Sequence, residues 1–136
     1  MNKISVIVAN KKFNSDKKNI SAVARRVFLL LKKDGYRVDF YLVDDDFIKK
    51  LNRVYRGKNK TTNVLSFCEP KDFISAPSKL KYLGEIYINP DFIVKNNQDN
   101  KLMVVHGVLH LFGYDHEYLK ERLKMEKKES DLLRMI

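Results

Sequence analysis

The sequence has few of the features that mark secreted, fibrous or membrane proteins. Its single cysteine, Cys68, excludes an internal disulfide and a zinc site built from cysteines. Its longest apolar runs, such as residues 27–31, are far too short to cross a lipid bilayer. Residues 1–9 contain one lysine and a short β-branched run, which is not the pattern of a signal peptide. We therefore expect a cytoplasmic protein with no membrane partner.

Internal repeats, low-complexity tracts and linkers rich in glycine and serine are also missing. What is there is a chain of 136 residues, of which 44% are hydrophobic and 32% are charged. This composition excludes global disorder, and the length fits one ordinary domain. A chain of this size buries roughly two-thirds of its unfolded surface when it folds, which is enough for one core. We expect a single domain over residues 1–136.

Positive charge is concentrated in the first part of the chain. Residues 1–60 contain 16 lysines and arginines against 6 acidic residues, whereas residues 61–136 contain 11 of each. The whole net charge of +10 therefore comes from the first 60 residues. A basic half beside a neutral half indicates a polyanionic partner, most simply nucleic acid, although a lysine-rich soluble surface would give the same count.

The hydrophobic pattern predicts four strands and about five helices. Strands are expected over 4–9, 38–43, 64–67 and 83–89, and helices over 20–33, from 44–46 to 55, 91–95, 102–111 and 118–135. Residues 71–81 read as a surface excursion. Strands and helices alternate at first and helices come last. We therefore predict an α+β fold, an α/β sandwich with a mixed four-stranded sheet and about five surrounding helices.

Two further expectations concern how the helices begin and which faces they bury. Asn14, Ser15 or Asp16 is expected to cap the first long helix, and the aspartates 44–46 are expected to cap the second. The predicted buried faces of the second and last helices consist of these apolar side chains: Phe47, Leu51, Val54 and Tyr55, and then Leu119, Leu123, Met125, Leu132 and Leu133.

All three histidines of the chain fall within eleven residues. His106 and His110 are one helical turn apart, so both imidazoles can reach one ion. His116 can join them only if the chain turns back, and Gly113 tolerates the backbone conformation that such a turn requires. Three neutral imidazoles without a fourth protein ligand are typical of an open catalytic zinc site. The alternative is a pair of core histidines that bind no metal.

The histidine spacing matches that of the metzincin metalloproteases, with one difference. In those enzymes a glutamate directly follows the first histidine and serves as the general base, whereas Gly107 occupies that position here. A peptidase built on this pattern would lack its base. We therefore expect a zincin-like metal-site helix in an enzyme other than a peptidase.

The segment HGVLHLFGYDH, residues 106–116, resembles the signature of the YbeY family of bacterial metal-dependent endoribonucleases. Two shorter motifs agree with that family. The first runs from Arg56-Gly57-Lys58 to the segment TNVLSF at 62–67, and the second is the Gly-Glu-Ile run at 84–86. The order and spacing of the three motifs agree with the family from residue 38 to residue 116.

This resemblance implies one zinc ion on His106, His110 and His116. It implies a single-strand-specific endoribonuclease that acts in maturation of ribosomal RNA, notably at the 3′ end of the small-subunit RNA, and in ribosome quality control. It also implies ribosomal RNA, the ribosome and ribosome-associated proteins as partners. Arg56 corresponds to the family's functional arginine.

The chemistry of a zinc-dependent nuclease assigns roles to further residues. A zinc ion on three histidines lowers the pKa of its water to about 7, and the phosphodiester must be held beside it. Arg56 suits that task because a guanidinium contacts two phosphate oxygens and stays charged. We therefore predict Arg56 and His106 as catalytic residues, and Arg56, Lys58 and Lys60 as substrate-binding residues. For Asp115 the sequence leaves two alternatives open: it orients a histidine, or it caps the last helix.

Two alternatives remain from the sequence. The chain could be a ribosome-associated assembly factor whose zinc site is structural, while a partner cleaves the RNA. It could also be a metallohydrolase acting on a small molecule. The basic first half disfavours the small substrate, and the open coordination position disfavours a purely structural zinc.

Overall fold

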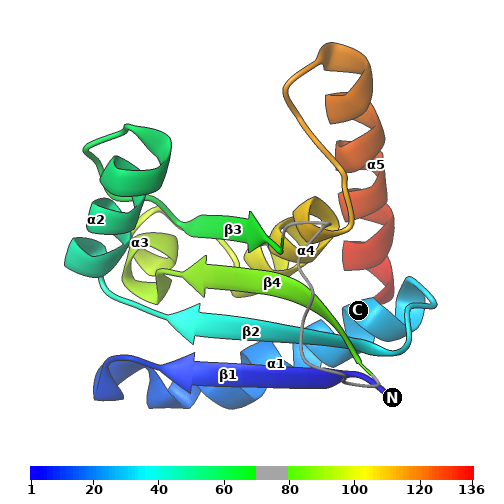
Figure 1. Ribbon diagram of the computed structural model, residues 1–136, viewed down its shortest axis with the longest axis horizontal. Coiled ribbons are helices and arrows are strands. Elements are labelled where there is room, and N and C mark those ends of the chain that lie inside the picture. The colour runs from blue at the N-terminus through cyan, green and yellow to red at the C-terminus, as the bar shows by residue number, and fades with distance from the viewer. Residues whose placement is uncertain (70–79) are drawn as a thin grey trace.

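A computed structural model describes residues 1–69 and 80–136 (Figure 1). The described residues form four strands, five α-helices and one 3-10 helix. In chain order these are β1 (Lys3–Val8), η1 (Lys11–Phe13), α1 (Asn14–Leu30), β2 (Tyr36–Leu42), α2 (Asp45–Arg56), β3 (Val64–Cys68), β4 (Lys81–Ile88), α3 (Pro90–Lys95), α4 (Asn100–Leu111) and α5 (Leu119–Met135). Within these ranges no helix has the length and apolar character needed to span a membrane. The expected excursion at 71–81 falls almost entirely outside the described residues.

The sheet is mixed, as predicted, with the strand order β1-β2-β4-β3. β1 pairs with β2 and β2 with β4 in parallel, whereas β3 pairs with β4 antiparallel. β3 is therefore an edge strand, and its outer edge faces the space between α2 and the start of α5 in Figure 1. This α+β arrangement confirms the predicted fold class.

One face of the sheet is covered by α1 and α4, and the main core lies between these layers. α1 packs against β1 and α4 packs against β3 and β4, while the two helices also contact each other. The apolar side chains that α4 buries include Met103, Val104, Val105, Val108 and Leu109. A helix that is buried over most of its circumference is held rigidly, so the histidines on α4 start from a fixed backbone.

Gly107 allows α4 to lie directly on the sheet. A Cβ atom at this position would come within 2.9 Å of a methyl group of Ile86 and 3.3 Å of the Ser66 hydroxyl oxygen. Both distances are shorter than normal contacts, so a side chain here would push α4 away from β3 and β4. The position where a metzincin carries its general base is therefore occupied by the packing of helix on sheet.

The buried face of α2 differs from the one predicted. Asp44 caps the helix as expected, with its carboxylate accepting from the Phe47 backbone N–H at 3.0 Å. The residues that α2 buries are Ile48 and Asn52, whereas Phe47, Val54 and Tyr55 are exposed. α2 meets the sheet through a small cluster of Ile48, Val43 and Leu65, against which the predicted Leu51 packs half-buried. Phe47 and Tyr55 add ring-to-ring contacts, with Tyr87 and Phe67 respectively. A narrow contact of this kind buries one strip of the helix instead of a full apolar face.

The first half of α5 also differs from the prediction. Met125 and Leu132 are buried and Leu133 is half-buried, as expected, but Leu119 and Leu123 are exposed. Figure 1 shows the reason, because the N-terminal turns of α5 extend beyond the sheet and only its later turns pack on the body. α1 likewise begins earlier than predicted. Residues 14–16 lie inside α1, and its first turn follows η1, which Asn10 caps.

Candidate metal centre

Three imidazoles meet at the C-terminal end of α4. One ring nitrogen from each of His106, His110 and His116 lies within 4.8 Å of the other two. The Nε2 atoms of His106 and His110 are 3.1 Å apart. Two nitrogens at about 2.0–2.1 Å from a tetrahedral zinc ion are separated by about 3.3 Å, so this pair is already spaced for one ion. The set of three donors fits a metal that prefers nitrogen and leaves one coordination position without a protein ligand.

The turn that brings His116 back is located where the sequence predicts it. Gly113 has a φ of +95°, which favours glycine, and it directly follows the end of α4. Asp115 then stabilises the next turn, because its Oδ1 accepts from the backbone N–H groups of His116 at 2.7 Å and Glu117 at 3.2 Å. Its carboxylate lies 3.8 Å from the His116 ring, and the N-cap of α5 is Tyr118. Asp115 therefore holds the loop and does not cap α5.

Glu129 orients the first histidine. Its Oε1 lies 2.8 Å from Nδ1 of His106, and both side chains are largely buried. A carboxylate at this atom favours the tautomer that carries its proton on Nδ1 and leaves Nε2 free toward the other histidines. Glu129 lies on α5, 23 residues from His106, and a sequence pattern of ligand spacing does not include it. In the sequence, the only feature that points to Glu129 is that it lies on the same predicted helix as Met125 and Leu132, which the prediction places on the buried side.

Its surroundings hold His110 in the neutral form. Burial lowers its pKa to about 4, and the nearby His106 and His116 add to the effect. A neutral imidazole has a free lone pair, which is the form that binds a metal. His110 is therefore ready as a ligand throughout the physiological pH range.

The basic residues predicted from the sequence lie in the same open pocket as the histidines. Arg56, Lys58 and Lys60 line it from α2 and the following loop, facing the three histidines and the Gly113–Asp115 turn. The Arg56 guanidinium donates from Nη2 to the Ser66 carbonyl at 3.0 Å and lies over the Phe67 ring at 5.6 Å. These contacts fix the arginine at the edge of β3 while leaving it exposed to solvent.

A network of buried and half-buried polar side chains holds the basic loop. Asn52 donates to the Lys60 carbonyl at 2.9 Å, and Gly57 ends α2 in the left-handed conformation. Asn89, which is fully buried, donates to Asp45 at 2.6 Å and to the Thr62 carbonyl at 3.3 Å. Hydrogen bonds from Asn89 and Thr61 lower the pKa of Asp45, so its carboxylate stays ionised. None of Asn52, Asp45 and Asn89 was among the sequence-predicted residues, because their role depends on contacts between distant segments.

The remaining polar candidates of this region have structural positions. The Ser66 hydroxyl donates to the Gly107 carbonyl at 3.4 Å, which joins β3 to α4. Cys68 is exposed at the end of β3. Burial of the thiol itself raises its pKa, with Arg56 opposing the shift, so Cys68 stays protonated and poorly nucleophilic.

Comparison with known proteins agrees with this arrangement. The family model described as endoribonuclease YbeY matches residues 5–136. A protein from Neorickettsia sennetsu named endoribonuclease YbeY is 32% identical over 143 residues, which cover 98% of this chain and 96% of the relative. A protein of the same name from Roseiflexus castenholzii is 40% identical over 109 residues, covering 70% of this chain and 69% of the relative.

A solved structure gives the same result for the fold. The solution structure of a Thermotoga maritima protein has a TM-score of 0.54 and 26% identity to this chain, and the match covers 97% of this chain and 89% of the other. The histidine triad, the fold and the matches along nearly the whole length agree with the resemblance seen in the sequence. The chain belongs to the endoribonuclease YbeY family.

Proposed function

We propose that this protein is a zinc-dependent endoribonuclease that cleaves single-stranded RNA. Its proposed substrate is ribosomal RNA, with a role in maturing the 3′ end of the small-subunit RNA and in ribosome quality control. The observation that carries the proposal is that Arg56 and the three histidines line one open pocket. Membership of a family named for endoribonuclease activity supports RNA as the substrate class.

The proposed chemistry divides between the metal and the residues of the chain. When bound on His106, His110 and His116, a zinc ion supplies Lewis acidity toward phosphate and water. Arg56 binds the phosphodiester beside the histidines and stabilises the negative charge that develops on it during cleavage. Lys58 and Lys60 hold neighbouring phosphates through charge alone. Glu129 keeps the His106 ring oriented, with its proton on Nδ1.

Zinc is proposed as the metal because of the donor set. Three imidazole nitrogens also accept copper or nickel, and carboxylate-preferring ions such as magnesium are disfavoured. Both proposed catalytic residues, Arg56 and His106, face the same pocket, and the ring of His106 is fixed by Glu129.

Incubation of metal-defined protein with structured ribosomal RNA tests the proposal. Zinc-loaded wild type is expected to cleave at unpaired positions, whereas chelated wild type and the His110→Ala variant are expected to show no cleavage above background. Readdition of zinc should restore cleavage to the chelated wild type and not to His110→Ala. Cleavage that survives in zinc-free His110→Ala protein would overturn the metal-dependent mechanism.

The assembly-factor alternative predicts a different result in the same experiment. Any cleavage in the preparation would then come from a partner, would fade with further purification and would not respond to Arg56→Ala or to zinc removal. The exposed position of Arg56 beside the histidines favours the enzyme, because a structural zinc site has no use for a phosphate-binding group at its open side.

A further inference from the structure

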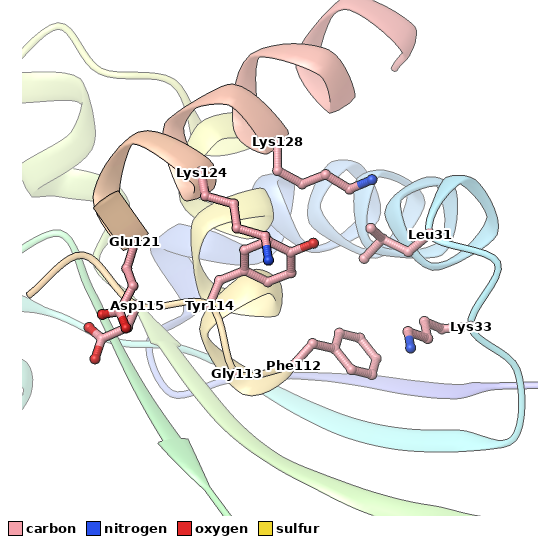
Figure 2. Close-up of a pocket in the computed structure, with 9 residues that line it drawn as sticks. All are labelled: Leu31, Lys33, Phe112, Gly113, Tyr114, Asp115, Glu121, Lys124 and Lys128. Carbon is pink, nitrogen blue, oxygen red and sulfur yellow. The ribbon is translucent and has the colours of Figure 1, made fainter. Parts of the chain in front are cut away.

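A second pocket lies on the other side of the loop that carries His116, shown in Figure 2. Its walls come from the end of α1, from the turn at 112–115 and from the exposed first half of α5. Gly113, Tyr114 and Asp115 line both this pocket and the pocket of the metal centre. The two pockets are therefore neighbours separated by one short loop.

Three lysines from two distant parts of the chain converge on this second pocket. Lys33 follows α1, and Lys124 and Lys128 are one helical turn apart on α5. Within residues 1–69 and 80–136, none of the three forms an ion pair within the usual distance. Lysines gathered without acidic partners repel one another, and an anion between them removes that repulsion.

The pocket also offers aromatic surface beside the lysines. The Lys33 amino group lies 5.2 Å from the centre of the Phe112 ring, and Tyr114 is a second aromatic residue of the lining. Two acidic residues, Asp115 and Glu121, lie together at the opposite end of the pocket in Figure 2. Because both acidic residues lie at that opposite end, positive charge dominates the end formed by the lysines.

We propose that this pocket binds a flanking nucleotide of the RNA strand that enters the metal centre. Lys33, Lys124 and Lys128 contact its backbone phosphates, and the strand crosses the Gly113–Asp115 turn between the two pockets. The inference rests on the proposed function, because it extends the path of the same substrate. Lysines that contact phosphates contribute affinity without reading sequence.

The first turns of α5, which extend beyond the sheet in Figure 1, form one wall of the pocket. Lys124 on this wall lines the pocket together with Lys33, which belongs to the basic first half of the chain. α5 carries four acidic residues against four lysines and two arginines, so the sequence gives this helix only a small positive excess. The fold brings two of its lysines into the same pocket as Lys33, and the half of the chain without net charge therefore also contributes to the proposed RNA-binding surface.

RNA affinity measured on two matched double variants tests this inference. Lys124→Gln/Lys128→Gln removes two pocket lysines, whereas Lys120→Gln/Lys127→Gln removes two lysines of the same helix that line neither pocket. Both variants lose the same charge and keep helix-forming residues. The probe is a fluorescent single-stranded RNA of about 12 nucleotides, titrated with zinc-loaded protein at several salt concentrations. Zinc content and melting temperature are compared with wild type first.

The pocket variant is expected to bind the RNA about tenfold more weakly than the control variant, with the slope of log K against log salt reduced by about 1.4 for two lost contacts. Equal affinities and equal slopes for the two variants would overturn the inference, and an acidic protein would then be the alternative ligand of the pocket. If the wild type still cleaves RNA in that case, the proposed function is unaffected. If the wild type binds RNA and does not cleave it, the proposed function is refuted, and the comparison of the two variants still tests whether the pocket binds RNA. A wild type that binds no RNA would refute both.

Discussion

The two sides of the metal pocket are built in different ways. The histidine side consists of His106, His110 and His116, which come from one stretch of eleven residues fixed by a buried helix and a glycine turn. The basic side consists of Arg56, Lys58 and Lys60, which sit on an exposed helix end and a loop. That loop is held by hydrogen bonds from Asn52 and, through Thr62, from Asn89.

The two sides therefore differ in what determines their position: local backbone geometry for the histidine side, and tertiary contacts for the basic side. The spacing of His106 and His110 along α4 and the turn at Gly113 place the histidine side, so the positions of its backbone follow from local structure, while Glu129 orients one ring. The position of the basic side depends on side chains that come from the N-cap of α3 and from α2 and meet only in the folded protein. Changes on the basic side are therefore expected to alter substrate handling, and changes on the histidine side are expected to alter metal binding.

Replacement of Arg56 gives the largest expected effect on the basic side. Arg56→Ala should reduce RNA cleavage by about a hundredfold or more, because one preorganised charge on the transition state is lost. Zinc content and melting temperature should stay near wild type, since an exposed arginine contributes little to folding. Cleavage rate, metal content and melting temperature are measured on the same preparations.

Two further variants serve as controls for Arg56→Ala. Arg56→Lys should recover only part of the activity, because an ammonium keeps the charge and loses the two-point contact of the guanidinium. Arg53→Ala removes an exposed arginine from the same helix that does not line the pocket, and its cleavage should stay within about threefold of wild type. Arg56→Ala protein that cleaves at the wild-type rate would remove Arg56 from the mechanism and leave the metal centre intact.

The sequence predicted the histidine side of the site and the fold class because both depend on local patterns. The turn at Gly113, the helix over α4 and the mixed sheet were all read from period and spacing. The errors occurred where packing is narrow. Phe47, Leu119 and Leu123 have the right spacing for a buried face, but α2 meets the sheet along one strip only and the first turns of α5 extend beyond the sheet, so these side chains stay exposed. The spacing of apolar residues along a helix shows which residues share a face, but it does not show whether another element covers that face.

The supporting side chains could not be predicted for a related reason. Glu129 and Asn89 act through contacts that span 23 and 44 residues of chain, to His106 and Asp45 respectively. Nothing in their local sequence differs from that of an ordinary surface glutamate or a helix-capping asparagine. Their roles follow only from the arrangement of β4, α2, α4 and α5.

Asn89→Ala tests whether the basic side depends on tertiary hydrogen bonds. The variant removes a fully buried amide that donates to Asp45, Thr61 and the Thr62 carbonyl, so that within the described residues Asp45 keeps only the hydrogen bond from the Thr61 hydroxyl. We expect the free energy of unfolding to fall by about 2 kcal/mol, within the usual cost of an unpaired buried group. Denaturant unfolding measures this change. Asn96→Ala, at an exposed asparagine, is the matched control, and equal losses in the two variants would refute the supporting role of Asn89.

Glu129→Gln tests the support of the histidine side. The substitution keeps the shape of the side chain and removes the charge beside His106, so zinc affinity should fall about tenfold. Competition with a chelator of known affinity measures it directly, without reference to activity. Glu129→Asp should restore part of the affinity, whereas Glu126→Gln, on an exposed part of α5, should leave it unchanged. Unchanged zinc affinity in Glu129→Gln would show that the carboxylate plays no part in holding the ligand.

The smallest expected effect concerns the pH dependence of stability in metal-free protein. The pKa of His110 is about 4 in the folded chain and near 6.5 when unfolded. Below pH 6.5 the unfolded chain binds a proton that the folded chain does not, so stability is full above about pH 7 and falls as the pH drops toward 4. Because His110 is partly exposed, the loss between pH 7 and pH 5 should be about 1 kcal/mol.

Urea unfolding of metal-free wild type and of His110→Gln at the two pH values isolates this contribution. Glutamine does not titrate, so the variant should lose less stability than wild type on acidification, by the amount that His110 contributes. The same comparison for Arg56→Ala should show no change from wild type, because an arginine stays charged across this range. An equal loss in wild type and His110→Gln would mean that His110 takes up its proton as readily in the folded chain as in the unfolded one. In that case the histidine side would need the metal itself to become organised, and the contrast with the basic side would disappear.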